Sequence, residues 1–139
     1  MPKSIVKKPW GKEKIWYVSD DEKVQFKTLH INAGEQTSLQ YHRNKVEIVF
    51  PLDANAILDD GGKQKKLKPH FSQQINSGKV HRYKAVGGPT VLAELNCGDD
   101  TDIVRIEDKY GRVLNGNGVK EVKKGEKAVV KVEEKKADV

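Results

Sequence analysis

The chain has 139 residues, and its 26 basic and 20 acidic side chains give a formal net charge of +6. This length suits one domain with a buried core, and no apolar run reaches the roughly 20 residues that a membrane-spanning helix needs. The single cysteine excludes an intramolecular disulfide. Basic and acidic residues are interspersed and aromatic residues make up only 6% of the chain, so no nucleic-acid surface is visible.

The N-terminal segment 1–16 carries positive charge but lacks the apolar stretch of a secretory signal. We therefore expect a cytoplasmic protein with neither a membrane partner nor a nucleic-acid partner. The mild excess of positive charge suits a phosphorylated small molecule instead.

Short segments rich in β-branched, leucine and aromatic residues recur along the chain and predict strands. In chain order these segments span 14–18, 24–31, 46–52, 55–59, 71–75, 81–86, 90–95 and 102–107. The best hairpin signal is DDGGK, where Gly61 and Gly62 can adopt a positive φ. No helical periodicity of comparable length competes with the strands, so the sequence predicts an all-β sandwich or barrel.

The end of the chain differs in composition from the rest. The sequence NGNG at 115–118 resembles a linker, and lysine and glutamate dominate the residues behind it. We therefore expect one domain over 1–112 and a charged C-terminal tail over 113–139. The tail is expected to be mobile or to add one edge strand through KAVVKV at 127–132.

A group of possible metal ligands follows the N-terminal strands. Segment 26–42 reads as one strand, and side chains two residues apart share a face of a strand, so Gln40 and His42 point the same way. Glu47 joins them only if the chain turns a corner through 43–46 into the next strand.

A fourth ligand is expected from elsewhere, and His81 at the start of the predicted strand 81–86 is the candidate. Imidazole, carboxylate and amide donors together suit one divalent metal ion, namely Zn²⁺, Mn²⁺, Fe²⁺, Co²⁺ or Ni²⁺. Taken without further context, one histidine and one glutamate five residues apart are more often solvated polar side chains than metal ligands.

Four ordered segments supply that context. They are KKPWGKEKIW at 7–16, AGEQTSLQYHRNKVE at 33–47, SGKVHR at 77–82 and DDTDIVRIEDKYGR at 99–112. In order and spacing they resemble the type II mannose-6-phosphate isomerase family of the cupin superfamily. In that family the domain occurs alone or as the C-terminal half of bifunctional mannose-6-phosphate isomerase/GDP-mannose pyrophosphorylases. The resemblance covers nearly all of 5–112 and does not extend to the tail.

The resemblance implies a double-stranded β-helix, the jelly-roll barrel of cupins, with one divalent metal ion at its open end. The implied ligands are Gln40, His42, Glu47 and His81. The implied activity is an aldose–ketose isomerase that interconverts mannose 6-phosphate and fructose 6-phosphate through an enediol. Because cupins often pair through their sheets, a homodimer is implied by the same analogy.

Strand alternation identifies a candidate catalytic base. In the predicted strand 90–95, alternation puts Glu94 on one face with Thr90 or Asn96, opposite an apolar face. Glu94 is therefore the candidate base, although a glutamate on a half-exposed strand fits the same pattern.

The basic residues near the C-terminal end of the domain are candidates for binding the sugar phosphate. A guanidinium can contact a phosphate through two parallel hydrogen bonds, so we expect Arg105 and Arg112 to bind it, with Arg82 or Lys84 as helpers. The alternative is that the arginines pair with the acidic residues of the same segment, Asp102, Glu107 or Asp108.

One departure from the family pattern bears on the substrate. Asn44 stands where family members often have a second histidine. If that position contacts substrate, the specificity has changed. A cupin acting on another phosphosugar or sugar nucleotide, a metal-dependent oxygenase and a non-catalytic cupin that binds metal and sugar are the alternatives.

Overall fold

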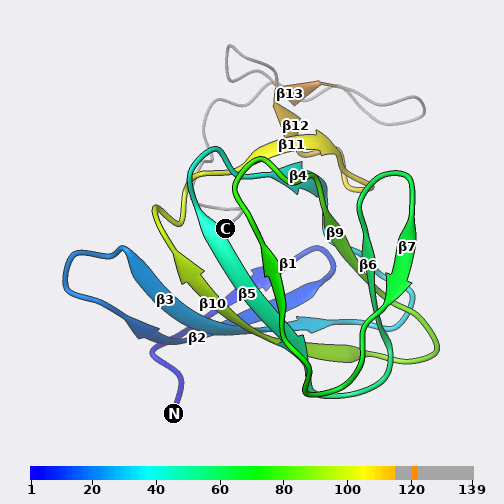
Figure 1. Cartoon of the computed structure of the whole chain (residues 1–139), viewed down its shortest axis with the longest axis horizontal. Coiled ribbons are helices and arrows are strands. Elements are labelled where there is room, and N and C mark those ends of the chain that lie inside the picture. Colours follow the sequence, from blue (N-terminus) through cyan, green and yellow to red (C-terminus); the bar gives the residue numbers. More distant parts are fainter. Residues whose placement is uncertain (115–119, 122–139) are drawn as a thin grey trace.

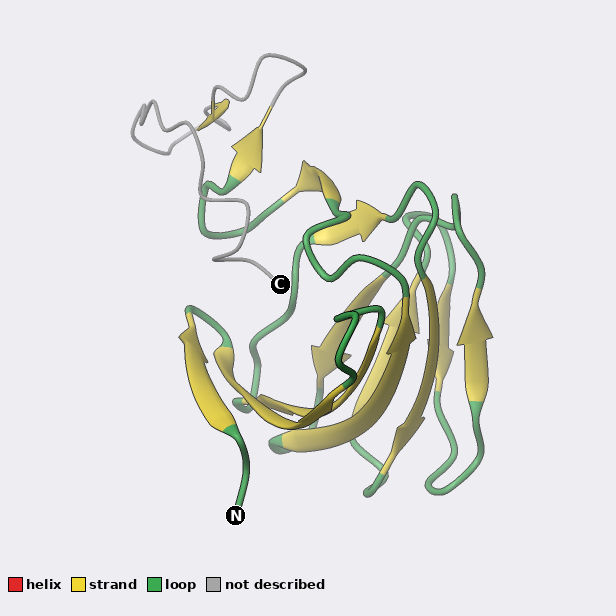
Figure 2. Cartoon of the chain, turned by 90° about the vertical axis from the view of Figure 1, so that its left-hand side faces the viewer, coloured by secondary structure: helices red, strands yellow, loops and turns green. Residues whose placement is uncertain are grey.

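The computed structural model describes residues 1–114 and 120–121 of the chain. Every regular element in this part is a strand, as Figure 2 shows. The strands are, in chain order, β1 (Ser4–Lys8), β2 (Gly11–Val18), β3 (Val24–Ile31), β4 (Leu39–Tyr41), β5 (Val46–Pro51), β6 (Ala56–Asp59), β7 (Gln64–Lys66), β8 (Gln73–Ile75), β9 (Arg82–Ala85), β10 (Thr90–Cys97), β11 (Val104–Glu107), β12 (Val113–Leu114) and β13 (Lys120–Glu121). A helix long and apolar enough to cross a membrane is absent from the described residues.

Two antiparallel sheets wrap around a common interior. The larger sheet has six strands in the order β1-β2-β3-β10-β5-β8, and the smaller has three in the order β7-β6-β9. The short β4–β11 pair lies across one end of the barrel, at the top of Figure 1. Non-consecutive strands are neighbours in both sheets, which is the connectivity of a jelly roll.

The inward face of the larger sheet changes character along its strands. Alternate residues of β3, β10 and β5 point into the barrel. The inward rows run Leu29–Leu92–Pro51, then Lys27–Glu94–Val49, then Gln25–Asn96–Glu47. One half of the interior is therefore apolar, and the half toward the β4–β11 end is polar.

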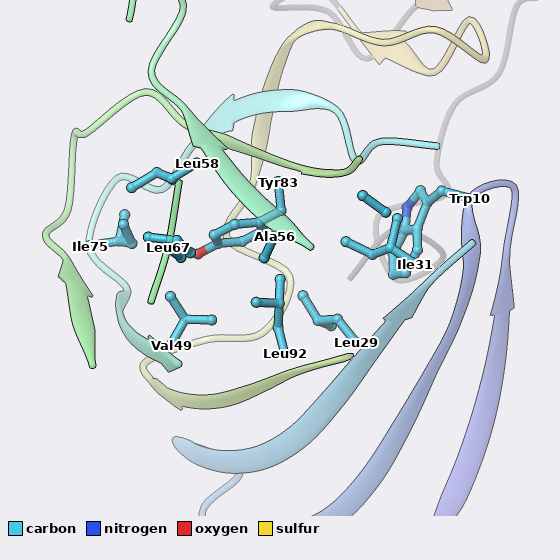
Figure 3. Packing of buried hydrophobic residues seen from close by; sticks show 11 residues of the cluster. Trp10, Leu29, Ile31, Val49, Ala56, Leu58, Leu67, Ile75, Tyr83 and Leu92 are labelled. Carbon is cyan, nitrogen blue, oxygen red and sulfur yellow. The ribbon is translucent and has the colours of Figure 1, made fainter. Parts of the chain in front are cut away.

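The apolar half holds the core. The buried cluster comprises Trp10, Leu29, Ile31, Val49, Ala56, Leu58, Leu67, Ile75, Tyr83, Ala85 and Leu92. Figure 3 shows these side chains filling the space between the strands of the two sheets, with Trp10 beside Ile31. Burial of this apolar surface is the main source of stability, at roughly 25 cal/mol per Å².

Most predicted strands are confirmed, and the errors have physical causes. Segment 24–31 is β3, and the predicted strand 90–95 is β10 with two further residues. The single strand expected over 26–42 is wrong, because the chain leaves the sheet after Ile31 and Gln40 lies on the separate strand β4. Strand β7 was not predicted because its three residues are all exposed and show no alternation.

Two further expectations concern a turn and the tail. The sequence suggested a positive φ for Gly61 and Gly62 in the hairpin between β6 and β7. Of these two glycines, only Gly61 has a positive φ, at 95°. The carboxylate of Asp60 accepts the backbone N–H groups of Gly62 and Lys63 and closes the turn. The edge strand expected at 127–132 lies outside the described residues.

Candidate metal centre and substrate pocket

Three predicted ligands meet at the polar end of the barrel. His42 directly follows β4, Glu47 is the second residue of β5, and His81 directly precedes β9. All three side chains are buried, and their ligand atoms lie within 4.8 Å of one another. The Nε2 atom of His42 is 2.7 Å from one carboxylate oxygen of Glu47, and that of His81 is 3.5 Å from the other.

The tautomers of the two histidines follow from their backbone contacts. Nδ1 of His42 lies 2.6 Å from the carbonyl oxygen of Asp102, and Nδ1 of His81 lies 2.9 Å from that of Lys79. A carbonyl can only accept, so each Nδ1 carries a hydrogen and each ring turns its Nε2, the atom free to ligate a metal, toward Glu47. Both Nε2 atoms are buried without a hydrogen-bond partner.

Two imidazole Nε2 atoms therefore face one carboxylate in a buried position. Desolvation by burial would raise the pKa of Glu47, but its hydrogen-bonding contacts with His42 and His81 outweigh burial and hold that pKa well below its usual value. Two imidazole nitrogens and a carboxylate that converge in a buried position suit a cation, and histidines that donate Nδ1–H to a carbonyl are typical metal ligands. The residues present thus fit a divalent metal ion.

Gln40, the fourth predicted ligand, lies on β4 beside this cluster. Its backbone exchanges two hydrogen bonds with that of His81, at 2.9 and 2.8 Å, which ties β4 to the start of β9. Its side-chain oxygen accepts a hydrogen bond from the Ser38 hydroxyl at 2.6 Å. Gln40 lines the same pocket as His42 and Glu47 but is held by Ser38.

The corner between β4 and β5 brings Glu47 to His42, as the sequence required. The carboxylate of Asp102 accepts the backbone N–H groups of Arg43, Asn44 and Lys45 at 2.9, 2.7 and 3.0 Å. Sequence reasoning did not find this function of Asp102, because the bonded residues are 57 to 59 positions apart and no local pattern links them.

A pocket opens beside the cluster and contains the candidate base. Its cavity volume is about 40 Å³, room for an ion or a few water molecules beside the cluster. Glu94 lines it from the inward face of β10 and is only 4% exposed, so the alternative of a surface glutamate does not hold. Burial and the nearby charge of Glu47 raise the pKa of Glu94 to about 8. The side-chain amide of Asn96 donates a hydrogen bond to Glu94 at 2.9 Å.

Arg105 and Arg112 both line this pocket. Arg105 donates from Nε to the Ser38 hydroxyl at 3.2 Å. Arg112 forms two hydrogen bonds to the Asp108 carboxylate, at 2.8 and 3.0 Å, so the expected alternative of pairing within the segment applies to this arginine.

Arg82 and Lys84, the predicted helpers for the phosphate, are not among the residues that line the pocket. On β9 it is Tyr83 that faces the interior, and its two neighbours therefore face away. Arg82 donates to the carbonyl of Thr37 and to the carboxylate of Glu107, and Lys84 lies 3.4 Å from the carboxylate of Asp59.

The comparisons with known proteins agree with this geometry. A family model described as the C-terminal domain of mannose-6-phosphate isomerase matches residues 2–108. The chain belongs to this family. Among curated proteins, it is 34% identical over 114 residues to the mannose-1-phosphate guanylyltransferase ManC of Salmonella typhimurium, covering 78% of this chain and 23% of that protein. It is 34% identical over 113 residues to the xanthan biosynthesis protein XanB of Xanthomonas campestris, with 77% and 23% covered. The chain thus spans about a quarter of these relatives.

Solved structures establish the fold. The capsular polysaccharide assembling protein CapF of Staphylococcus aureus superposes with a TM-score of 0.66 at 15% identity, covering 77% of this chain and 32% of that chain. A cupin-2 domain protein of Rhodospirillum rubrum gives a TM-score of 0.54 at 14% identity, covering 64% and 61%. The predicted double-stranded β-helix of the cupins is confirmed.

This mannose-6-phosphate isomerase family domain contains pocket residues that sequence reasoning missed. Lys27 is buried, and its ammonium donates to Glu13 at 3.2 Å and to Asp100 at 3.1 Å. Lys45 is also buried, with its ammonium 3.7 Å from both Glu47 and Asp100. The signal for Lys27 was available, since it alternates with inward-facing Leu29 in β3.

Tyr83 connects the core of the domain to the ligand cluster. Its ring belongs to the core cluster, and its hydroxyl donates to a carboxylate oxygen of Glu47 at 3.1 Å. Burial, and then the charge of Glu47, raise the pKa of Tyr83 well above its usual value, so the hydroxyl stays protonated as a donor. Asn44, in contrast, is exposed in the corner and does not line the pocket.

Proposed function

We propose that this domain is a metal-dependent aldose–ketose isomerase that interconverts mannose 6-phosphate and fructose 6-phosphate. The observation that supports the proposal is one pocket that combines a buried metal-ligand cluster with a separate buried carboxylate, Glu94. Membership in the mannose-6-phosphate isomerase family supports the choice of substrate. The proposal concerns this domain alone, because the matched region covers only 23% of the curated relative ManC.

His42, Glu47 and His81 would hold one divalent metal ion, with Gln40 as the candidate fourth ligand. The nitrogen and oxygen donors suit Zn²⁺, Mn²⁺, Fe²⁺, Co²⁺ or Ni²⁺. Such an ion supplies Lewis acidity that polarises a sugar carbonyl.

Glu94 would then transfer the proton between the two sugar carbons through the enediol. It is suited to this because its raised pKa makes its carboxylate a stronger base than an ordinary glutamate, near the pH of the cell. The hydrogen bond from Asn96 fixes the orientation of the carboxylate, and the packed β-sheet beneath excludes water from one side.

Four basic side chains line the pocket and would attract the phosphate, namely Lys27, Lys45, Arg105 and Arg112. The two guanidiniums are the candidates for direct phosphate contact, since their planar donors match phosphate oxygens. The two buried lysines already neutralise carboxylates and contribute mainly to the positive potential of the pocket.

The test is proton NMR of mannose 6-phosphate in D₂O with metal-loaded protein. We expect fructose 6-phosphate to form, with deuterium at C1 of this product and at C2 of the recovered mannose 6-phosphate, because the abstracted proton exchanges with solvent. His42→Ala is the control and should lose both signals together with the metal. If mannose 6-phosphate binds but shows neither product nor exchange with any of the five metals, the isomerase proposal fails and a binding function replaces it.

A further inference from the structure

We infer that Asp102 is a positioning residue for the metal ligand His42, with its carboxylate fixing the backbone after His42 and its carbonyl fixing the imidazole ring. The inference rests on the proposed metal site and adds a residue that ligates nothing itself. Asp102 is separated from the ligands in sequence and reaches them from the loop between β10 and β11.

The carbonyl of Asp102 decides which nitrogen of His42 is available. Because it accepts from Nδ1 at 2.6 Å, it leaves Nε2, the atom that lies 2.7 Å from Glu47, as the nitrogen that faces the metal site. Without this acceptor the hydrogen can occupy Nε2, and a protonated Nε2 cannot ligate a metal. The same bond also fixes the rotation of the ring.

The carboxylate of Asp102 fixes the chain on which both ligands are mounted. It accepts three consecutive backbone N–H groups, those of Arg43, Asn44 and Lys45, across both of its oxygens. These residues form the whole corner between His42 and the start of β5. One side chain therefore sets the separation and relative direction of His42 and Glu47.

The loop that carries Asp102 is itself held at several points. The backbone N–H of Gly98 donates to the carbonyl of Lys23 at 2.6 Å, and Asp100 accepts from buried Lys27. Gly98 has a φ of +134°, and a Cβ there would lie 2.9 Å from the Cα of Lys45, so this end of the loop packs directly on the corner. Asp102 thus acts from a fixed position.

The chain offers a matched control at the opposite end of β5. Asp53 also accepts three hydrogen bonds, from the backbone of Asn55 and Val91 and from the hydroxyl of Thr90, at 3.0, 2.9 and 2.6 Å. It joins a loop to β10 in the same manner but touches no metal-ligand candidate. Asp53→Ala should therefore cost a similar amount of stability without affecting the metal site.

The experiment compares the wild-type protein, Asp102→Ala, Asp102→Asn and Asp53→Ala by two measurements. Zn²⁺ affinity is measured by competition with a chromogenic chelator, and the tautomer of His42 is read in metal-free protein by long-range ¹H–¹⁵N NMR. The chain has 4 histidines, so the His42 signals can be assigned with His42→Ala.

We expect Asp102→Ala to weaken Zn²⁺ binding about 10–100-fold, because the corner between His42 and Glu47 loses its three hydrogen bonds to the carboxylate. Alanine keeps the backbone carbonyl at this position, so His42 should keep its Nδ1–H tautomer. Asp102→Asn retains part of the acceptor set and should fall between, and it replaces the alanine variant if that fails to fold. Asp53→Ala should match wild type in both measurements.

Zn²⁺ affinity in the Asp102 variants equal to that of wild type would overturn the inference, as would an equal loss in Asp53→Ala. Wild-type His42 with its hydrogen on Nε2 alone would overturn the role of the carbonyl. If wild-type protein binds no metal, the proposed function fails at that point. The tautomer of metal-free His42 still decides whether Asp102 positions the ring.

Discussion

The two halves of the barrel interior are built on the same strands, but one half is apolar and forms the core, and the other is polar and contains the pocket. On β10, Leu92 packs into the apolar core, and Glu94 two residues later lies in the polar pocket. Leu92 gains stability from burial, whereas a buried carboxylate such as Glu94 costs free energy unless it is paired or protonated. The apolar half provides the stability that allows the polar half to retain costly groups at a functional site.

The largest effect should come from removing the candidate base in the polar half. Glu94→Gln keeps the shape and the contact with Asn96 but cannot take a proton, so kcat should fall about 10²–10⁴-fold. Zn²⁺ affinity should stay near wild type, since Glu94 is not in the ligand cluster. Steady-state kinetics with mannose 6-phosphate and metal titration measure the two quantities. A variant with wild-type kcat would eliminate Glu94 as the base.

The apolar half should respond to truncation with a loss of stability. Leu92→Ala removes a fully buried side chain between Leu29 and Pro51, and should lower the free energy of unfolding by about 2–5 kcal/mol. Val91→Ala, on the outward face of the same strand and half-buried, is the control and should cost less. Urea denaturation of metal-free protein gives both values. Equal losses would mean that the two faces of β10 do not differ as described.

The next largest effect should be on the pH dependence of stability, which depends on a group in the polar half of the interior. The pKa of Glu94 is raised to about 8 in the folded chain, from 4.5 in the unfolded chain. Between these values the folded state retains a proton that the unfolded state has lost, so stability falls as pH rises, by at most about 1.4 kcal/mol per pH unit. Below pH 4.5 and above pH 8 this contribution is constant. Comparing metal-free wild type with Glu94→Gln isolates it, and parallel curves would contradict the raised pKa.

The smallest effect is expected outside the pocket. Lys84→Ala removes a partly exposed ion pair with Asp59 and should change the free energy of unfolding by no more than about 1 kcal/mol. Its KM for mannose 6-phosphate should equal that of wild type, whereas Arg105→Ala in the pocket should raise KM. A tenfold rise in KM for Lys84→Ala would restore Lys84 as a phosphate-binding residue.

Strands that depend on neighbouring residues in the sequence were predicted correctly. The β-branched, leucine and aromatic residues of β3 and β10 made both strands readable from the sequence, but the alternation in β10 did not decide whether Glu94 faces inward or outward. The ligands His42, Glu47 and His81 were found by motif, but their convergence depends on the corner that Asp102 holds from a distant loop. No short-range signal encodes that contact.

The placement of Arg82 and Lys84 away from the pocket has a related cause. Charge identified Arg82 and Lys84 as possible phosphate-binding residues, but charge does not say which face of a strand points inward. Tyr83 determines which face of β9 points inward, because its ring packs in the core and its hydroxyl donates a hydrogen bond to Glu47. Tyrosine occurs on both buried and exposed faces of strands, so its presence did not predict which face of β9 points inward.

The position of Cys97 makes the loop that carries Asp102 accessible to spectroscopy. It is the single cysteine of the chain, it is exposed, and it ends β10 directly before Gly98. In register with Val24 and Val46, its side chain points to the outer face of the sheet, away from the pocket. A thiol-reactive fluorophore or spin label would therefore attach at one site in the unmodified protein. It would report movements of residues 98–102 during metal and sugar binding without occupying the space that either ligand needs.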